Sequence, residues 1–317
     1  MAEAWGLFAL GLVLLALGGD TLVKGASGLA QKAGLSPFTA GLLLVAFGTS
    51  LPELFVNGAA LLQGEPALAL GNAVGSNLVN LGLVLPVAAL CGTVLVRLRL
   101  LTPLLLVLVV ASALLMVFGL DGRINRVEGA ILLAGFLVVV VRLVVLGRRE
   151  ASEVRTGVET YASTRTVLWL NLLRLVIGIV LLGYGAREVV QAMRELAPTL
   201  GLTPLIAGLL PLAIGTALPE LAAAIVAARR GQGDMVLGHV IGSSVCNLLL
   251  VVAGMAVIAP LALPASFVRL ELPAAIVLAV VLVPILRGDG RVSRGEATVL
   301  LLAFVGWVAL ELASLSS

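Results

Sequence analysis

Long apolar runs alternate along the chain with short breaks that contain charged residues, glycine or proline. A helix needs about 20 predominantly apolar residues to cross the hydrocarbon core of a membrane. The predicted spans lie near residues 5–24, 35–62, 67–91, 100–120, 127–146, 166–190, 201–228, 234–260, 269–287 and 295–314. The pattern therefore predicts an all-α integral membrane protein with ten transmembrane helices.

The composition agrees with this class and excludes several others. Of the 317 residues, 61% are hydrophobic and only 12% are charged, whereas a soluble domain carries roughly 25% charged residues. The net charge of +3 is dispersed over short loops, without the clustered basic face that nucleic-acid binding requires. Cys91 and Cys246 lie in apolar stretches and form neither a disulfide framework nor a CxxC metal motif. The lipid bilayer is the expected partner, and no nucleic acid or protein partner is indicated.

The longest hydrophilic stretch, residues 147–165, separates five predicted spans from five. We therefore expect one half at residues 1–146, a linker at residues 147–165 and a second half at residues 166–317. If the loops alternate sides, one side collects 14 of the 20 Lys and Arg residues and the other side 5. Because basic loops remain in the cytoplasm, this distribution predicts a multi-pass inner-membrane protein with a cytoplasmic linker and both termini extracytoplasmic.

The second half repeats the first. The matching segments are 35–54 with 202–221 and 71–80 with 238–247, both at an offset of 167, and 121–128 with 289–296 at an offset of 168. Five spans separate equivalent elements, and an odd number inverts the second copy relative to the first. Secondary transporters with such inverted repeats bind their substrates where the two copies meet, near the bilayer midplane.

Glu53 and Glu220 are carboxylates inside predicted spans, at equivalent positions of the repeat. A charged side chain at mid-bilayer costs about 2.5–3.5 kcal/mol, so each one needs a partner or a function. Each follows a proline, Pro52 or Pro219, which removes a backbone donor and leaves carbonyl oxygens available. Such backbone is tolerated at membrane depth only where it lines a cavity enclosed by protein. A hydrophilic site is therefore expected here.

Hydroxyl and amide side chains accompany both glutamates at helical spacing. The pairs four residues apart are Thr49 with Glu53, Thr216 with Glu220, Ser76 with Asn80, and Ser243 with Asn247. Carboxylate, hydroxyl, amide and carbonyl oxygens are hard ligands. They suit calcium or sodium ions better than zinc or copper, which prefer imidazole or thiolate ligands.

These duplicated segments resemble the alpha repeats of the cation/calcium exchanger superfamily, most closely its prokaryotic sodium/calcium exchanger branch. The motifs that carry the resemblance lie within residues 35–85 and 202–252. The resemblance implies that the two glutamates bind calcium together with threonine side chains and backbone carbonyls, and that neighbouring serines help to bind sodium. The implied ligands are Thr49, Ser50, Glu53, Ser76 and Asn80 in the first copy, Thr216, Glu220, Ser243 and Asn247 in the second, and the backbone carbonyls of Ala46 and Ala213.

The second copy departs from this family pattern at three positions. Ala217 stands where the family usually has a serine, and Asn247 stands where sodium/calcium exchangers often have an aspartate. His239 replaces the asparagine that the first copy keeps as Asn72. We expect His239 to be a neutral side chain that hydrogen-bonds to backbone, with proton coupling as the alternative.

The function expected from these features is secondary antiport, without a cofactor and without enzymatic activity. Two ionised glutamates supply a charge of −2, which one calcium or two sodium ions would neutralise, so the two ions should compete for one site. Alternating access of that site would exchange calcium for sodium. Calcium/proton exchange on Glu53 and Glu220 is the alternative, because Ala217 and Asn247 remove a hydroxyl and a possible charge. An intramembrane hydrolase that uses His239 and a serine is a remote alternative, since no nucleophile motif accompanies it.

Overall fold

The computed structural model describes residues 1–33, 47–97, 101–147 and 167–314, and these residues are almost entirely helical. The α-helices are α1 (Ala2–Lys32), α3 (Leu51–Leu62), α4 (Pro66–Val79), α5 (Leu85–Cys91), α6 (Leu101–Phe118), α7 (Arg126–Gly147), α9 (Leu168–Thr199), α10 (Pro204–Ala207), α11 (Ala213–Thr216), α12 (Leu218–Arg229), α13 (Gly233–Cys246), α14 (Ala253–Ile258), α15 (Leu272–Arg287) and α16 (Arg294–Ser314). Two 3₁₀ turns are η1 (Gly48–Ser50) and η3 (Gly119–Asp121). Four π-helical segments are η2 (Asn80–Val84), η4 (Gly208–Leu212), η5 (Asn247–Val252) and η6 (Phe267–Glu271).

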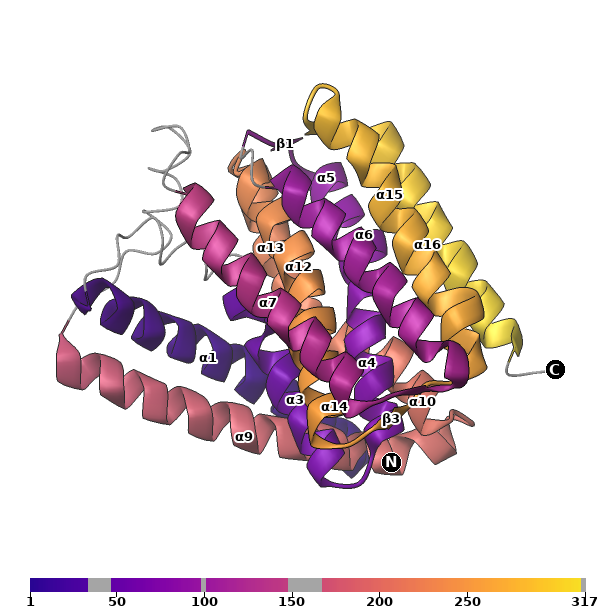
Figure 1. Ribbon diagram of the computed structural model, residues 1–317. Helices are drawn as coiled ribbons and strands as arrows, with labels where there is room; N and C mark the ends of the chain where they lie inside the picture. Colours follow the sequence, from indigo (N-terminus) through magenta and orange to yellow (C-terminus); the bar gives the residue numbers. More distant parts are fainter. Residues whose placement is uncertain (34–46, 98–100, 148–166, 315–317) are drawn as a thin grey trace.

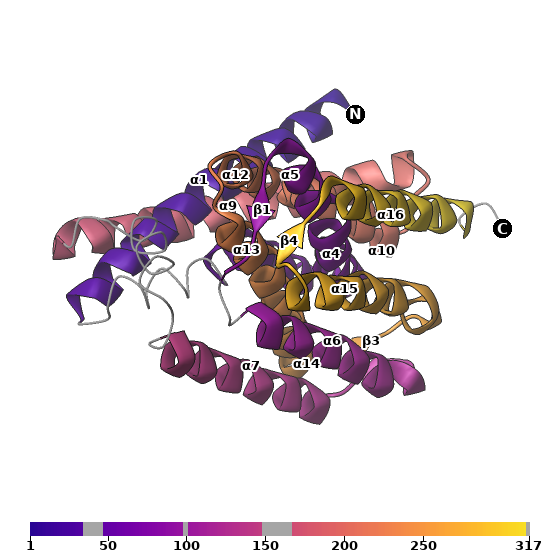
Figure 2. The same ribbon diagram turned by 90° about the horizontal axis from the view of Figure 1, so that it is seen from above.

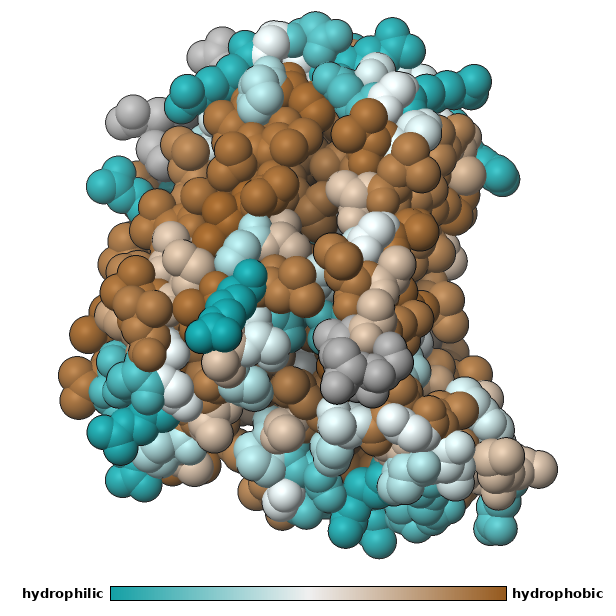
Figure 3. Space-filling model, turned by 90° about the vertical axis from the view of Figure 1, so that its right-hand side faces the viewer, coloured by the Kyte–Doolittle hydropathy of each residue, from teal (hydrophilic) through white to brown (hydrophobic). Residues whose placement is uncertain are grey.

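Eight helices in the described part of the chain are long and apolar enough to cross a membrane. A bent pair, Pro204–Thr216 and Leu218–Arg229, makes a ninth span with 43° between its two parts. The predicted span 35–62 lies partly in residues 34–46, outside the described residues, as does most of the predicted linker. Hydrophilic residues gather at the two ends of the molecule, and apolar residues cover most of the surface between them (Figure 3). A multi-pass, all-helical membrane protein is thus confirmed, and the count of ten stays a prediction.

Two continuous spans form the core of the bundle. One runs through α4, η2 and α5, the other through α13, η5 and α14, and 78% of the residues in the most apolar part of each are buried. The other six spans bury only 22–39% of theirs, because one side of each faces outward. Figures 1 and 2 show α4 and α13 in the interior, with α6, α7, α15 and α16 packed around them. Residues on these two core spans are therefore the ones best shielded from lipid.

Short strands tie loops of the two halves together at both ends of the bundle. Strand β1 (Val94–Leu95) pairs with β4 (Arg291–Val292), and β2 (Arg123–Ile124) pairs with β3 (Leu261–Ala262), both antiparallel. Strands β1 and β3 occupy equivalent positions at the offset of 167 residues, yet they lie at opposite ends of the molecule (Figure 1). Each end therefore joins one loop from each half.

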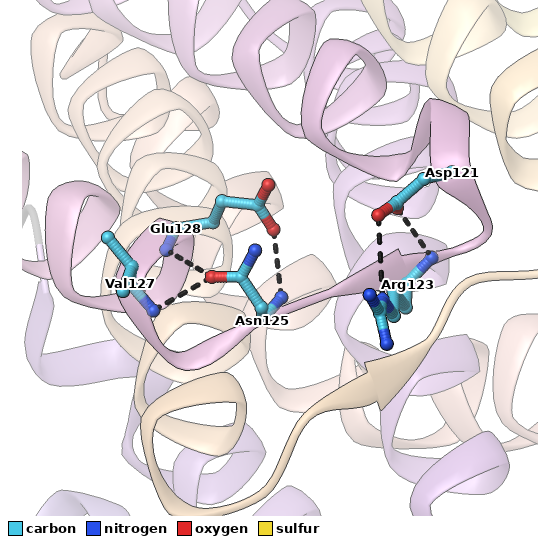
Figure 4. A network of polar contacts seen from close by, with 5 residues as sticks. All are labelled: Asp121, Arg123, Asn125, Val127 and Glu128. Carbon is cyan, nitrogen blue, oxygen red and sulfur yellow. Dashed lines mark hydrogen bonds and ion pairs between the residues drawn. The ribbon is translucent and has the colours of Figure 1, made fainter.

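The repeated segment at residues 121–128 proves to be a turn followed by a helix cap (Figure 4). The Asp121 carboxylate accepts a hydrogen bond from the backbone N–H of Arg123 at 3.1 Å. The Asn125 side-chain oxygen accepts from the N–H groups of Val127 and Glu128 at 2.9 and 3.1 Å, and the Glu128 carboxylate accepts from the N–H of Asn125 at 2.8 Å. This reciprocal arrangement is a capping box, which satisfies free N–H groups where α7 begins.

The second copy of this segment does the same for α16. Asp289 accepts from the N–H of Arg291 at 3.0 Å, Glu296 accepts from the N–H of Ser293 at 2.8 Å, and the Ser293 hydroxyl accepts from the N–H of Glu296 at 3.3 Å. The repeat at an offset of 168 residues is thus a signal for starting a helix. These carboxylates are engaged in capping rather than in the predicted ion site.

Helices α1 and α9 lie side by side and run steeply across the direction of the other helices (Figure 1). Glycines spaced seven residues apart line their contact: Gly11, Gly18 and Gly25 on α1, and Gly178 and Gly185 on α9. A Cβ atom at Gly11 or Gly185 would lie 2.8 Å from the carbonyl oxygen of the other glycine. Only glycine allows the two backbones to approach this closely, as in other membrane helix pairs.

We predict that Gly185→Ala weakens this helix pair. The added methyl group would overlap the backbone of α1, so the free energy of unfolding should fall by roughly 1–3 kcal/mol. Gly183→Ala is the matched control on the same helix, because a Cβ there would meet nothing within 4 Å. Thermal unfolding of both variants in detergent, followed by size-exclusion chromatography, measures the difference. Equal melting temperatures would contradict the close contact.

Candidate functional site

Both glutamates lie in the first turn of a helix that begins directly after a break in the backbone. The 3₁₀ turn η1 precedes α3 and Glu53, and the 43° bend precedes α12 and Glu220. Pro52 and Pro219 stand in these first turns, where a helix has no use for the missing N–H group. The carboxylates are 1% and 4% exposed. The breaks thus place two buried carboxylates at positively polarised helix N-termini.

The other predicted ligands lie where the two core spans change their winding. Ser76 and Ser243 are in the last turns of α4 and α13, and Asn80 and Asn247 are the first residues of η2 and η5. All four side chains are at most 1% exposed. A π-helical segment inside an α-helical span is rare and often marks a functional site. Here it recurs at equivalent positions of the two halves.

Ser243 joins the two halves by direct hydrogen bonds. Its hydroxyl oxygen accepts a hydrogen bond from the Ser50 hydroxyl at 2.8 Å and another from the Asn80 amide group at 3.3 Å. Ser50 and Asn80 belong to the first half, and Ser243 belongs to the second. Three predicted ligands from η1, η2 and α13 therefore meet at one point.

Thr216 and Asn247 make further contacts across the repeat. The Thr216 hydroxyl lies 3.5 Å from the side-chain oxygen of Asn72 and 3.3 Å from the carbonyl oxygen of Ala213. That carbonyl also accepts from the N–H of Ala217 at 3.1 Å. The Asn247 amide group donates to the side-chain oxygen of Asn77 at 3.3 Å. The carbonyl of Ala213 thus already has two donors within reach.

Five buried oxygens of the predicted ligands have no hydrogen-bond partner among the described residues. They are Glu53 Oε2, Glu220 Oε2, Ser76 Oγ, Asn80 Oδ1 and Asn247 Oδ1. The two carboxylates are also close enough to interact electrostatically. A buried polar group without a partner costs about 1–3 kcal/mol, so such a cluster calls for an explanation. Positive charge near the two carboxylates would relieve their repulsion, and bound cations are natural partners for oxygens of this kind.

The donor chemistry fits hard cations. No three His, Cys, Asp or Glu side chains gather anywhere in the part of the chain that the structure describes. The cluster instead combines two carboxylates with neutral hydroxyl and amide oxygens. Oxygen sets of this kind suit calcium, which takes six to eight oxygen ligands, or sodium.

Two of the predicted ligands cannot be placed in this cluster. Ala46 lies outside the described residues, and for Thr49 only the backbone, in η1, is described. The assignment of all eleven residues as ion ligands remains a prediction, although the structure brings several of them together.

The absence of a hydroxyl group at Ala217 changes the hydrogen bonding in the structure. Ala217 occupies the position of Ser50 in the second half. Ser50 donates to Ser243, and the corresponding partner of Ala217 would be Ser76. The Ser76 hydroxyl is fully buried and has no partner among the described residues. The missing hydroxyl at position 217 thus leaves one side of the site less satisfied than the other.

Two further carboxylates, Glu271 and Glu311, are buried although the sequence motifs did not predict a role for them. Glu271 in η6 is 0% exposed and Glu311 near the end of α16 is 2% exposed, and they interact electrostatically. The first half has apolar residues at both corresponding positions. Both glutamates fall inside predicted spans, 269–287 and 295–314, and this was the signal that could have found them. They lie on peripheral helices, apart from the duplicated motifs.

A pocket of about 380 Å³ opens between α12 and α13. Ala223, Ala224 and Arg230 line it, and His239 lies four residues before Ser243 in its wall. In the first half, the equivalent of Ala223 is Val56, which is fully buried. Helix α9 packs along α3 there, whereas α1 makes no comparable contact with α12. The two halves of the site are therefore unequally covered.

The profile of the family described as "Sodium/calcium exchanger protein" matches residues 3–145 and 170–313. Inner membrane protein YrbG of Escherichia coli (strain K12) is 33% identical over 98% of the chain and 97% of its own length. Sodium/calcium exchanger MaX1 of Methanosarcina acetivorans is 28% identical over 95% of the chain and 96% of its own length.

A solved structure shares the fold over nearly the whole chain. The sodium-calcium exchanger NCX_Mj, from a crystal soaked with Na⁺ and Sr²⁺, superposes with a TM-score of 0.68 and 28% sequence identity. The alignment covers 97% of this chain and 98% of NCX_Mj. The likeness thus extends over both halves.

We predict that the two equivalent serines contribute unequally to stability. Ser243→Ala would leave the Ser50 and Asn80 donors without their acceptor, at a cost of about 1–3 kcal/mol. Ser76→Ala is the matched control, because it removes no hydrogen bond that the structure shows. Thermal unfolding in detergent with EGTA and without sodium excludes any contribution from bound ions. An equal decrease in the melting temperature of both variants would contradict the asymmetric hydrogen-bond network.

Proposed function

The chain belongs to the sodium/calcium exchanger protein family, and from this premise we propose that it carries calcium ions across the inner membrane in exchange for sodium ions. It is a secondary transporter and not an enzyme. The observation that carries the proposal is the cluster of five unpartnered oxygens, which includes one from each of Glu53 and Glu220. The proposed ligand set is completed by hydroxyl, amide and backbone carbonyl oxygens, which belong to Thr49, Ser50, Ser76, Asn80, Thr216, Ser243, Asn247 and the backbone of Ala46 and Ala213.

Charge explains why one site would exchange the two ions. Glu53 and Glu220 together carry −2 when ionised, which one calcium or two sodium ions balance. If one calcium and two sodium ions were bound at the same time, uncompensated positive charge would remain in a buried, low-dielectric site. Calcium therefore leaves as sodium binds, and the gradient of one ion drives the movement of the other. This accounts for antiport without a nucleotide or another cofactor.

For the architecture we propose ten spans in two inverted halves, residues 1–146 and 166–317, joined by a cytoplasmic linker. The strand pairs support the inversion, since β1 and β3 are equivalent in sequence and lie at opposite ends. The recurrence of π-helical winding at Asn80 and Asn247 supports it as well. The excess of basic residues on one side supports an arrangement with both termini outside the cytoplasm.

We further propose that this conformation opens the site toward the cytoplasm. The pocket between α12 and α13 has Arg230 in its lining, and this residue belongs to the side with the basic excess. On the opposite side, α9 covers α3. A movement of the α1 and α9 pair away from α3 and toward α12 would close the path from the site to the cytoplasm and open the path from the site to the opposite side of the membrane. The glycine-lined contact between α1 and α9 allows the two helices to move as one body.

Calcium-45 uptake into proteoliposomes tests the ion assignment. An outward-directed sodium gradient at constant pH should drive uptake by the wild type. Glu53→Gln and Glu220→Gln each remove one buried charge, so the affinity for calcium should fall by more than about a hundredfold. Glu271→Gln is the control, because this carboxylate is equally buried but outside the proposed site.

Two results would overturn the assignment. Uptake driven by a proton gradient but not by a sodium gradient would establish calcium/proton exchange on the same glutamates. Folded Glu53→Gln or Glu220→Gln protein with wild-type uptake would show that the ions bind elsewhere.

Cysteine accessibility tests the direction of opening. In a background with Cys91→Ala and Cys246→Ala, Ala223→Cys should react with an impermeant thiol reagent added to inside-out vesicles. Val56→Cys, at the equivalent position of the first half, should be protected because α3 is covered there. Protection of both positions would show that lipid, and not water, fills the pocket. Faster reaction at Val56→Cys would place the opening on the other side.

A further inference from the structure

Two buried asparagines lie behind the proposed site and connect the two halves. Asn57 is one helical turn after Glu53 on α3, and Asn72 is on α4, and both are 0% exposed. The Asn72 amide group donates to the side-chain oxygen of Asn57 at 3.0 Å. The Asn72 side-chain oxygen in turn lies 3.5 Å from the Thr216 hydroxyl, which belongs to the second half. A chain of polar contacts thus runs from α3 through α4 to α11.

The second half lacks the two asparagines themselves. At the offset of 167 residues, the equivalents of Asn57 and Asn72 are Ala224 and His239. Ala224 has no polar side-chain atom, and both residues line the pocket between α12 and α13. The duplicated motif therefore keeps the threonine and the glutamate in both halves but has the asparagine pair in one half only.

The pair controls where the hydrogen of the Thr216 hydroxyl goes. A hydroxyl group has one hydrogen to donate and two lone pairs that accept or bind a cation. Thr216 can donate to Asn72 or to the carbonyl of Ala213, 3.3 Å away in its own helix. Donation to Asn72 turns the hydrogen away from its own helix and frees one lone pair of the Ala213 carbonyl, while the N–H of Ala217 still occupies the other. Both oxygens then become available to one cation.

Asn57 decides which way the Asn72 amide is turned. The Asn57 oxygen holds the amide nitrogen of Asn72, which leaves the Asn72 oxygen to face Thr216. Without Asn57, the Asn72 amide could rotate and present its nitrogen, which cannot accept the hydrogen of Thr216. The Asn57 amide group has no acceptor among the described residues, so its contact with Asn72 is the one hydrogen bond that the structure shows for it.

We propose that Asn57 and Asn72 are positioning residues that aim the Thr216 hydroxyl oxygen and the Ala213 carbonyl at the bound cation. Their printed contacts lead to Thr216, in the second half. The inference rests on the proposed function, because it takes Thr216 and Ala213 to be ion ligands.

A double-mutant cycle tests this inference on the full-length protein in detergent. The affinities for calcium and sodium are read from the increase in melting temperature as each ion is added, so the readout does not depend on transport. Asn57→Ala introduces the residue found at the equivalent position, Ala224, and should weaken calcium binding about three- to tenfold, the value of one hydrogen bond. In a Thr216→Val background, which lacks the hydroxyl, the same substitution should change the affinity less than about twofold.

A purely structural role would behave differently. Asn57→Ala would then lower the melting temperature without ions, and the calcium affinity would be unchanged or would fall equally in both backgrounds. Either result overturns the inference. Asn57→Ser keeps a side-chain oxygen as acceptor and should retain more of the calcium affinity than Asn57→Ala. If Asn57→Ala does not fold, Asn57→Ser replaces it in the double-mutant cycle.

Failure of the proposed function gives a different signature. The wild type itself would then show no increase in melting temperature with calcium or sodium. If the wild type binds both ions and Asn57→Ala binds them equally well, only the positioning role is wrong.

Discussion

Two buried carboxylates that lie close enough to repel each other are the constraint on which the rest of this structure depends. Ionised Glu53 and Glu220 repel each other and have lost their hydration, so they are stable only when a cation balances them. The surrounding structure helps to stabilise these two negative charges. Helix breaks place the carboxylates at positively polarised helix N-termini, and the two most deeply buried spans carry neutral hydroxyl and amide oxygens. A permanent positive partner, such as an arginine, would satisfy the glutamates but would also abolish any need for a transported ion.

The duplicated site is less symmetric than its sequence motifs suggest. Ser50 and Ser243 form a hydrogen bond, whereas the equivalent position of Ser50 is Ala217 and leaves Ser76 without a partner. At the positions equivalent to the asparagine pair, Asn57 and Asn72, the second half has Ala224 and His239. Each difference alters an oxygen that would face the ions without altering the two glutamates. Duplication thus provides the charge, and small substitutions around it distinguish the ligands of one half from those of the other.

Much of this organisation could be predicted from the sequence, because apolar runs and buried charges obey simple rules in a membrane. The spans, the two glutamates and the duplicated serines and asparagines all follow from local patterns. Asn57 could not be identified in this way, since its importance depends on α3 packing against α4. The lengths of α1 and α9 also exceeded the predicted spans, because both helices continue past the ends of their apolar runs. The unequal covering of α3 and α12 is a property of helix packing that no local pattern encodes.

The two strand pairs have a consequence for how the protein is made. Strands β1 and β2 belong to the first half, and each finds its partner only in the second half. Helix α4, which carries the buried Asn72 and Asn77, is likewise covered by α10, η4 and η5 of the second half. When the ribosome has completed the first half alone, the backbone groups of β1 and β2 and the side-chain oxygen of Asn77 lack the partners that the second half supplies. Assembly of the bundle is therefore completed only after synthesis of the second half.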